Sequence, residues 1–321
     1  MAQPEKLVFC GTPQFAVPTL EKLVEAAFDV RLVLTQPDRP KGRGLEIVAS
    51  PVKQTALRLG LPVLQPEKIK HNEELRAKLE EIAPAAIIVV GYGRIIPSWM
   101  LQLPKYGNIN LHASLLPKYR GAAPIQWAIA NGETITGVTT MQLNEGLDTG
   151  DILLQEELAI ADDDMAQTVA PRLAAIGADL MIETLRRLQQ NSIKPQPQNH
   201  AEGTLAPVLK KEDGRIDFSR TAQEIYNRFR GFQPWPGAFT TFRGRNLNVT
   251  AMKPASDQIT AGQITAAQIF VSSGRLFVGC GNGTVLELLE LQPEGKKRIS
   301  AKDFLHGYRP QVEETLGEMV H

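Results

Sequence analysis

The sequence has few cysteines, no long hydrophobic run and no excess of charge of either sign. Cys10 and Cys280 are the only cysteines among 321 residues, and neither lies beside other metal-ligating residue types. Isolated cysteines of this kind predict reduced thiols, a cytoplasmic protein and no structural zinc. The longest apolar run, 85–90, is too short to cross a bilayer, and no basic segment leads into a longer apolar one near the N-terminus. We therefore expect no signal peptide and no membrane partner.

Three catalytic signatures are also missing. Gly11-Thr12-Pro13 follows the first predicted strand without the later glycines of Gly-x-Gly-x-x-Gly, which argues against a nicotinamide cofactor. Gly-x-Ser-x-Gly is absent around Ser114, so the sequence does not support a serine hydrolase. None of the five histidines pairs with another at the i, i+4 spacing with a glutamate, so we expect no metal site.

Length and composition indicate two domains. A chain of 321 residues with 43% hydrophobic and 22% charged content has room for two buried cores. Four proline or glycine residues stand among polar residues in 191–208, which predicts a linker between a catalytic domain at 1–190 and a second domain at 209–321. Residues 190–298 carry 14 Lys and Arg against 9 Asp and Glu, which is compatible with a polyanionic partner for the second domain.

The first domain alternates apolar and helical segments. Apolar runs predict buried strands at 6–10, 30–35, 85–90, 107–111 and 135–143. Helical periods lie between them or after them, and they are expected at 50–59, 72–82 and 165–190. This alternation predicts an α/β fold, a Rossmann-like and mostly parallel sheet with helices on both faces.

The second domain has short strands instead. They are expected at 238–242, 246–252, 263–271, 276–280 and 285–291, with helices at 222–230 and after Ser300. Five short strands with a basic excess suggest an OB-like β-barrel that binds nucleic acid. A barrel that only packs on the catalytic domain is the alternative.

Chemistry-bearing side chains gather where the strand at 107–111 ends. Asn110 and His112 are two residues apart, so on an extended chain they point the same way. Ser114 and Pro117 then begin a loop, and α/β sheets place ligands where strands end. An amide, an imidazole and a hydroxyl together suggest carbonyl chemistry, although Asn-x-His alone also suits a hydrogen-bonded strand end.

The octapeptide Asn-x-His-x-Ser-Leu-Leu-Pro at 110–117 resembles the signature of the formyltransferases that use 10-formyltetrahydrofolate. The resemblance covers essentially the whole chain and is strongest to the members that formylate methionine on initiator tRNA. It implies that Asn110, His112 and Asp148 are catalytic, with Asp148 in Leu-Asp-Thr-Gly-Asp at 147–151; a surface turn of solvated carboxylates is the alternative there. It also implies a folate site, formed by Gly91, Tyr92, Ser114, Leu115, Leu116 and Pro117.

Formyl transfer to an amine requires a donor for the developing oxyanion and a proton for the leaving nitrogen. We expect the Asn110 amide to stabilise the oxyanion and His112 to donate the proton. Asp148 would favour the imidazolium form of His112 and help to move the proton from the attacking amine.

The segment 36–44 is basic, with Arg39, Lys41 and Arg43 beside two prolines and two glycines. Its composition fits a solvated surface loop, and it also suits a loop that grips a phosphate backbone. The resemblance implies contact with the acceptor end of initiator tRNA, with Arg43 as the key arginine.

Three further positions are candidates for substrate contact. The resemblance places Phe15 against the methionyl group, although a core phenylalanine is equally compatible with the sequence. Lys210 and Lys211, at the start of the second domain, are expected to face the tRNA backbone.

The implied reaction transfers the formyl group of 10-formyltetrahydrofolate to the α-amino group of methionyl initiator tRNA, for translation initiation. We expect a cytoplasmic monomer that needs no metal. Two alternatives remain open. One is a folate-dependent formyltransferase acting on a small amine, such as an amino sugar or glycinamide ribonucleotide, and the other is a non-catalytic tRNA-binding protein. The basic segment argues against the first, and the complete Asn-His-Asp set against the second.

Overall fold

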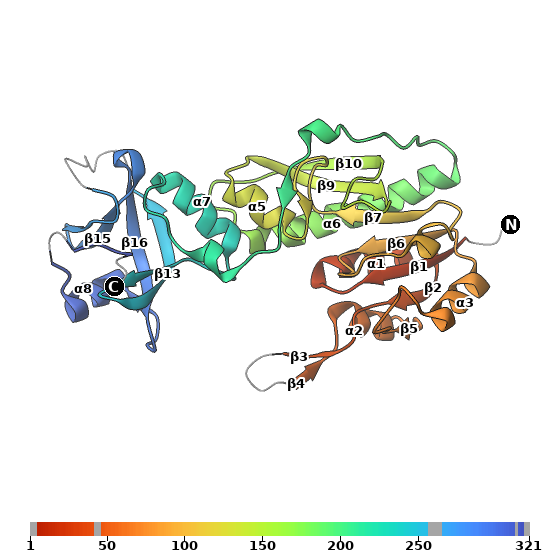
Figure 1. The fold of residues 1–321 in the computed structure, drawn as a ribbon, viewed down its shortest axis with the longest axis horizontal. Helices are drawn as coiled ribbons and strands as arrows, with labels where there is room; N and C mark the ends of the chain where they lie inside the picture. Colours follow the sequence, from red (N-terminus) through yellow and green to blue (C-terminus); the bar gives the residue numbers. More distant parts are fainter. Residues whose placement is uncertain (1–4, 42–45, 256–264, 312–313, 318–321) are drawn as a thin grey trace. The chain divides into compact units, whose positions relative to one another are not determined.

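The structure is a computed structural model, and it describes residues 5–41, 46–255, 265–311 and 314–317. The chain forms two compact units, which Figure 1 shows in sequence colours. The first unit contains residues up to Pro124 together with Ile135–Ala159 and Thr168–Pro207. The second contains Ile125–Thr134, Ile160–Gln167 and the residues from Val208 onward.

The first unit is built on a mostly parallel sheet of seven strands, as the sequence predicts. Five neighbouring strands are parallel, the sixth runs antiparallel to them, and the seventh, at the edge, pairs antiparallel with the sixth. In spatial order they are β10 (Ile152–Ala159), β9 (Ile135–Gln142), β7 (Asn108–His112), β6 (Ala86–Val90), β1 (Lys6–Gly11), β2 (Asp29–Leu34) and β5 (Val63–Leu64). All five residues of β6 are buried, since an unbroken apolar strand suits a sheet covered on both faces.

Helices cover both faces of this sheet, which confirms the predicted architecture. Val8 of β1 packs with Leu75 and Leu79 of α3 (Glu73–Ile82) on one face. On the other face, Leu111 of β7 lies so close to α6 (Ala166–Gln189) that a Cβ on Gly177 would be 2.7 Å from its Cδ2 atom. Asn110 and His112 alternate with Leu111 along β7 and therefore share the face of Val8.

Local signals set where the remaining helices of this unit begin. The Ser50 hydroxyl accepts a hydrogen bond of 3.1 Å from the Lys53 amide at the start of α2 (Pro51–Arg58), a helix that the sequence predicts at 50–59. Two other short helices complete the unit, α1 (Val17–Glu25) and α4 (Ser98–Leu101), and the sequence did not predict α4.

Two stretches predicted to lack regular structure contain short strands. In the basic segment, β3 (Arg39–Lys41) pairs with β4 (Glu46–Val48) as an antiparallel ribbon. In the stretch 191–208, β11 (Leu205–Ala206) pairs in parallel with β8 (Arg120–Gly121). β8 follows shortly after the octapeptide. The stretch up to Pro207 therefore belongs to the first unit and lies against the loop that follows β7.

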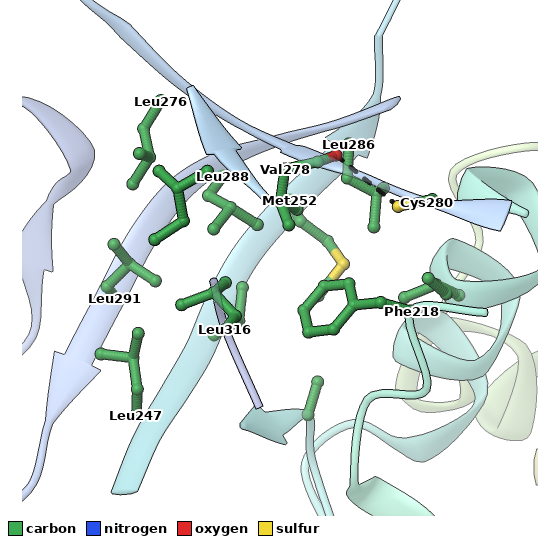
Figure 2. Close-up of a cluster of buried hydrophobic side chains, with 14 of the residues drawn as sticks. Phe218, Leu247, Met252, Leu276, Val278, Cys280, Leu286, Leu288, Leu291 and Leu316 are labelled. Carbon is green, nitrogen blue, oxygen red and sulfur yellow. Dashed lines mark hydrogen bonds between the residues drawn. The ribbon is translucent and has the colours of Figure 1, made fainter. Parts of the chain in front are cut away.

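The second unit contains a six-stranded antiparallel sheet, consistent with the predicted OB-like fold. Its strands are β12 (Phe239–Phe242), β13 (Arg245–Pro254), β14 (Ile269–Ser272), β15 (Arg275–Gly279), β16 (Val285–Pro293) and β17 (Ile299–Ser300). Figure 2 shows apolar side chains of β13, β15 and β16 packing together with Phe218. Three helices belong mainly to this unit, α5 (Pro124–Ala130), α7 (Ala222–Phe232) and α8 (Ala301–Tyr308).

One predicted strand of this unit is too long. The expected strand at 263–271 begins only at Ile269, because the Thr265 amide and hydroxyl both bond the Gln268 side chain in a local turn. Residues 263–264 lie outside the described part of the chain. By contrast, the helix predicted after Ser300 is confirmed as α8, and the Ser300 hydroxyl caps it by accepting a hydrogen bond of 3.1 Å from the Asp303 amide.

Candidate active site

Asn110 and His112 lie at the C-terminal end of β7, and both are buried. His112 Nε2 is 2.9 Å from the carbonyl oxygen of Tyr119. A carbonyl oxygen only accepts hydrogen bonds, so Nε2 carries a hydrogen and donates a hydrogen bond to the Tyr119 carbonyl. In the neutral ring, the lone pair is therefore on the other nitrogen, Nδ1.

Asp148 faces that second nitrogen. Its Oδ2 atom is 3.7 Å from His112 Nδ1 and accepts a hydrogen bond of 2.8 Å from the Gly121 amide. Asp148 has a positive φ of 50°, in a left-handed turn that aspartate tolerates better than most residues. The turn follows β9, which pairs with β7, so the predicted neighbourhood of His112 and Asp148 is present in the structure.

The Asn110 side chain makes no hydrogen bond to another residue of the described chain, although it is only 8% exposed. Its neighbour on the same face, Asn108, instead donates to the carbonyl oxygen of Met100 at 2.9 Å. A buried amide without a protein partner is suited to bind a ligand group, because leaving it unbonded is costly.

The loop after β7 is held by its own polar groups. The Ser114 hydroxyl donates to the Lys118 carbonyl at 2.7 Å and is fully buried. The Leu116 amide donates to Thr139 of β9, whose hydroxyl donates to the Ser114 carbonyl. Leu116 is buried and Leu115 packs near Gly137 of β9. Ser114 therefore stabilises the loop.

After β6, Gly91 has no side chain and the Tyr92 ring is buried, so backbone groups are what this segment can offer to a ligand. Gly91 has a positive φ of 54°, which turns the chain sharply. The Tyr92 ring is buried in the core with Met100, and this burial raises the pKa of its hydroxyl well above the ordinary value. The Tyr92 carbonyl accepts hydrogen bonds from Thr12 and Gln36.

Among the other candidate contact residues, those that the structure describes are exposed or half-buried. Phe15 is half-buried in a short 3-10 turn after Pro13, and Arg39 is exposed in β3. Arg43 and the side chain of Lys41 lie outside the described residues. Lys210 and Lys211 are exposed at the start of a 3-10 turn in the second unit.

Three residues that the sequence did not single out also surround the site. Gln198 donates to the backbone carbonyls of Asp148 and Gly150. Arg120 bonds Gln198, and Thr204 accepts a hydrogen bond of 2.8 Å from the Tyr119 amide. Arg120 adjoins the octapeptide, but no local pattern marks Gln198 or Thr204 in their polar stretch.

The described residues provide neither a metal cage nor a membrane span. No three His, Cys, Asp or Glu side chains come together there as a metal site would need. Of the helices in these residues, none has both the length and the apolar composition to cross a bilayer.

An imidazole and a carboxylate that face each other at the end of a Rossmann-like sheet form an arrangement typical of an enzyme site. Residues 5–185 match the family described as formyl transferase, and residues 208–309 match the formyl transferase C-terminal domain. The methionyl-tRNA formyltransferase of Koribacter versatilis is 62% identical, covering 98% of this chain and 99% of its own. That of Solibacter usitatus is 53% identical, covering 98% of this chain and 99% of its own. The chain belongs to the formyl transferase family, among the methionyl-tRNA formyltransferases.

Solved structures share the fold at much lower sequence identity. An N-formyltransferase from Helicobacter canadensis, in complex with folinic acid and dTDP-3-aminofucose, has a TM-score of 0.67 and 20% identity, and covers 90% of this chain and 99% of its own. HypX from Aquifex aeolicus, in complex with tetrahydrofolic acid, has a TM-score of 0.61 and 16% identity, and covers 98% of this chain and 49% of its own.

Proposed function

We propose that this protein transfers the formyl group of 10-formyltetrahydrofolate to the α-amino group of methionyl initiator tRNA. The observation that supports it most directly is the Asn110, His112 and Asp148 cluster, in a chain that matches methionyl-tRNA formyltransferases over nearly its full length. The product, N-formylmethionyl-tRNA, serves translation initiation.

Each residue of the cluster has a separate task in this proposal. The free Asn110 amide donates to the formyl oxygen as it gains negative charge; losing one such donor costs about 3–4 kcal/mol of barrier in other enzymes. His112 Nδ1 accepts the proton of the attacking amine and returns it to the nitrogen that leaves. Asp148, facing Nδ1, stabilises the imidazolium between these two transfers. In the first of these two proton transfers, His112 therefore acts as a base.

The folate donor would contact the chain beside this cluster. We assign this binding to the Gly91–Tyr92 backbone, where the positive φ of Gly91 lets a flat ring approach, and to Leu115, Leu116 and Pro117. The Tyr92 ring and the Ser114 hydroxyl are buried, so their part in binding is to shape the site. Phe15, half-buried beside Pro13, is assigned to the methionyl group.

We further propose that the enzyme acts as a monomer in the cytoplasm. All residues of the cluster come from one chain. Cys10 and Cys280 are unpaired and buried, and burial raises the pKa of Cys280 to about 12, so neither thiol is poised for disulfide exchange.

The test of the function is a formyl-transfer assay with 10-formyltetrahydrofolate and three acceptors in parallel. We expect rapid turnover on methionyl initiator tRNA and at least about 100-fold slower turnover on methionyl elongator tRNA and on free methionine amide, since remote binding energy raises the rate of the chemical step. Turnover on amino sugars but on none of these three acceptors would replace the proposal with a small-amine formyltransferase.

The tRNA backbone is assigned to Arg39, Lys41 and Arg43 in the first unit and to Lys210 and Lys211 in the second. Changing Lys210 and Lys211 together to glutamine should weaken tRNA binding and lower the slope of log K against log salt by about 1 for each phosphate that is no longer neutralised. Filter binding at several salt concentrations measures both the affinity for tRNA and this slope. Lys68→Gln, at an exposed lysine of the first unit, is the matched control. A slope identical to that of the control would remove these lysines from the tRNA site.

A further inference from the structure

The turn that carries Asp148 is exposed, yet one buried side chain holds its backbone at two points. Asn144 to Leu147 are exposed, and the turn tightens so much that a Cβ on Gly150 would lie 1.7 Å from the Gln142 carbonyl oxygen. Gln198 Nε2 donates to the carbonyl of Asp148 at 2.9 Å and to that of Gly150 at 2.7 Å. Both hydrogens of one amide are therefore used to hold this turn.

The orientation of the Gln198 amide is determined by Arg120. Gln198 Oε1 accepts from Arg120 Nε at 3.1 Å and from Nη2 at 2.6 Å. Arg120 is 8% exposed and has no carboxylate within ion-pair distance in the described chain. A reversed amide would place two N–H donors against a buried guanidinium, so only one orientation satisfies both groups. His200 Nδ1 accepts a further hydrogen bond from Arg120 Nη2 at 3.1 Å.

The backbone around Arg120 holds both catalytic side chains. The preceding carbonyl, of Tyr119, accepts the His112 Nε2 hydrogen bond, and the following amide, of Gly121, donates to Asp148 Oδ2. The side chain of Arg120 bonds Gln198, which bonds the backbone of Asp148. These contacts form a closed ring, in which Gln198 holds the backbone of Asp148 while the Gly121 amide holds its carboxylate.

We propose that Gln198 is a positioning residue for formyl transfer, which fixes Asp148 opposite His112 through the Asp148 carbonyl and through Arg120. This inference rests on the function proposed above. Gln198 lies between the two matched family segments, which end at 185 and begin again at 208. The stretch predicted to be a linker, which belongs to the first unit as far as Pro207, is on this proposal part of the catalytic structure.

The first test compares Gln198→Ala with Gln196→Ala. Gln196 is an exposed glutamine of the same stretch that pairs with Ile152 through its backbone, so alanine leaves this pairing intact. We expect Gln198→Ala to lower kcat for methionyl initiator tRNA about 10- to 100-fold, because small misplacements of reacting groups cost about that much. The KM values for the tRNA and the folate should stay within about twofold of the control. A kcat equal to that of Gln196→Ala would overturn the inference.

A second variant separates positioning from packing. Gln198→Glu keeps an acceptor oxygen for Arg120 and nearly the same volume, but a second carboxylate oxygen replaces the nitrogen that donates to Asp148 and Gly150. We expect kcat to fall as far as in Gln198→Ala, with the melting temperature within a few degrees of the wild-type value. Full activity in Gln198→Glu would mean that Gln198 only supports Arg120, which overturns the inference even if the alanine variant fails to fold.

The last test uses a double mutant. If Gln198 acts through Asp148, adding Gln198→Ala to Asp148→Asn should slow the single-turnover rate by less than about twofold. If Gln198→Ala slowed the Asp148→Asn enzyme as much as it slows the wild type, Gln198 would act independently of Asp148. Wild-type enzyme is assayed alongside, and its failure to formylate methionyl initiator tRNA would contradict the proposed function rather than the assignment of Gln198.

Discussion

Replacing His112 with alanine should lower the single-turnover rate of formyl transfer by about 10³-fold or more, since acid–base catalysis by one side chain contributes about 10²- to 10⁴-fold. Alanine removes both the Nδ1 nitrogen that faces Asp148 and the Nε2 bond to the Tyr119 carbonyl. A loss of rate in this variant alone would not separate the chemistry from the support of the loop.

His112→Gln makes that separation. The Nε2 atom of glutamine reaches nearly the position of His112 Nε2, so it retains the donor to the Tyr119 carbonyl. It offers no titratable nitrogen toward Asp148, and we therefore expect it to be as slow as the alanine variant while its melting temperature stays close to that of the wild type.

The matched control is His71→Ala, at an exposed histidine that precedes α3, and it should keep the wild-type rate. Rates are measured with enzyme in excess over methionyl initiator tRNA, so that slow variants remain measurable. A His112→Gln enzyme within about tenfold of the wild type would show that Nδ1 is not the proton acceptor, and the order of proton transfer proposed here would be wrong.

Much of the site could be predicted because it depends on short-range geometry. Asn110 and His112 are two apart on a strand, and the alternation of side chains places them on one face without any knowledge of the fold. Asp148 was assigned from the resemblance of its Leu-Asp-Thr-Gly-Asp segment, and the structure brings it to His112 because the strand before it pairs with the strand of His112. The buried strand β6 and the helix α2 were equally visible in the sequence, as the apolar run 85–90 and the helical period at 50–59.

Side-chain directions beyond the strands could not be predicted. The alternation of β6 ends at Gly91, whose positive φ turns the Tyr92 ring into the core with Met100. Ser114 bonds the Lys118 carbonyl four residues away, a local bond that serine makes readily and that uses its hydroxyl within the loop.

Contacts between distant segments were also beyond prediction. Gln198 reaches Asp148 across 50 residues, and Thr204 reaches Tyr119 across 85. The strands that bring these segments together, β8 and β11, have two residues each, too few for a hydrophobic period to be recognised. Prolines and polar residues in this stretch predict a linker, because composition reports the absence of a core and not the presence of specific hydrogen bonds.

Asp148→Asn should also lower the single-turnover rate by about 10³-fold, while the fold and tRNA binding stay intact. Asparagine tolerates the left-handed backbone of this turn and can still accept the Gly121 amide through its oxygen. Only the negative charge opposite His112 Nδ1 is lost. In serine proteases, neutralising the carboxylate that orients the catalytic histidine costs about 10⁴-fold, which sets the scale of the expected effect.

Asp151→Asn is the matched control, because Asp151 ends the same turn and its backbone carbonyl, rather than its carboxylate, bonds the Gln142 amide. It should retain the wild-type rate and the wild-type dissociation constants for tRNA and folate. Since Asp148→Asn keeps those constants as well, its lost rate can be attributed to the transition state. If Asp148→Asn turned over at nearly the wild-type rate, the charge facing His112 would be unnecessary, and the geometry of the loop alone would have to account for catalysis.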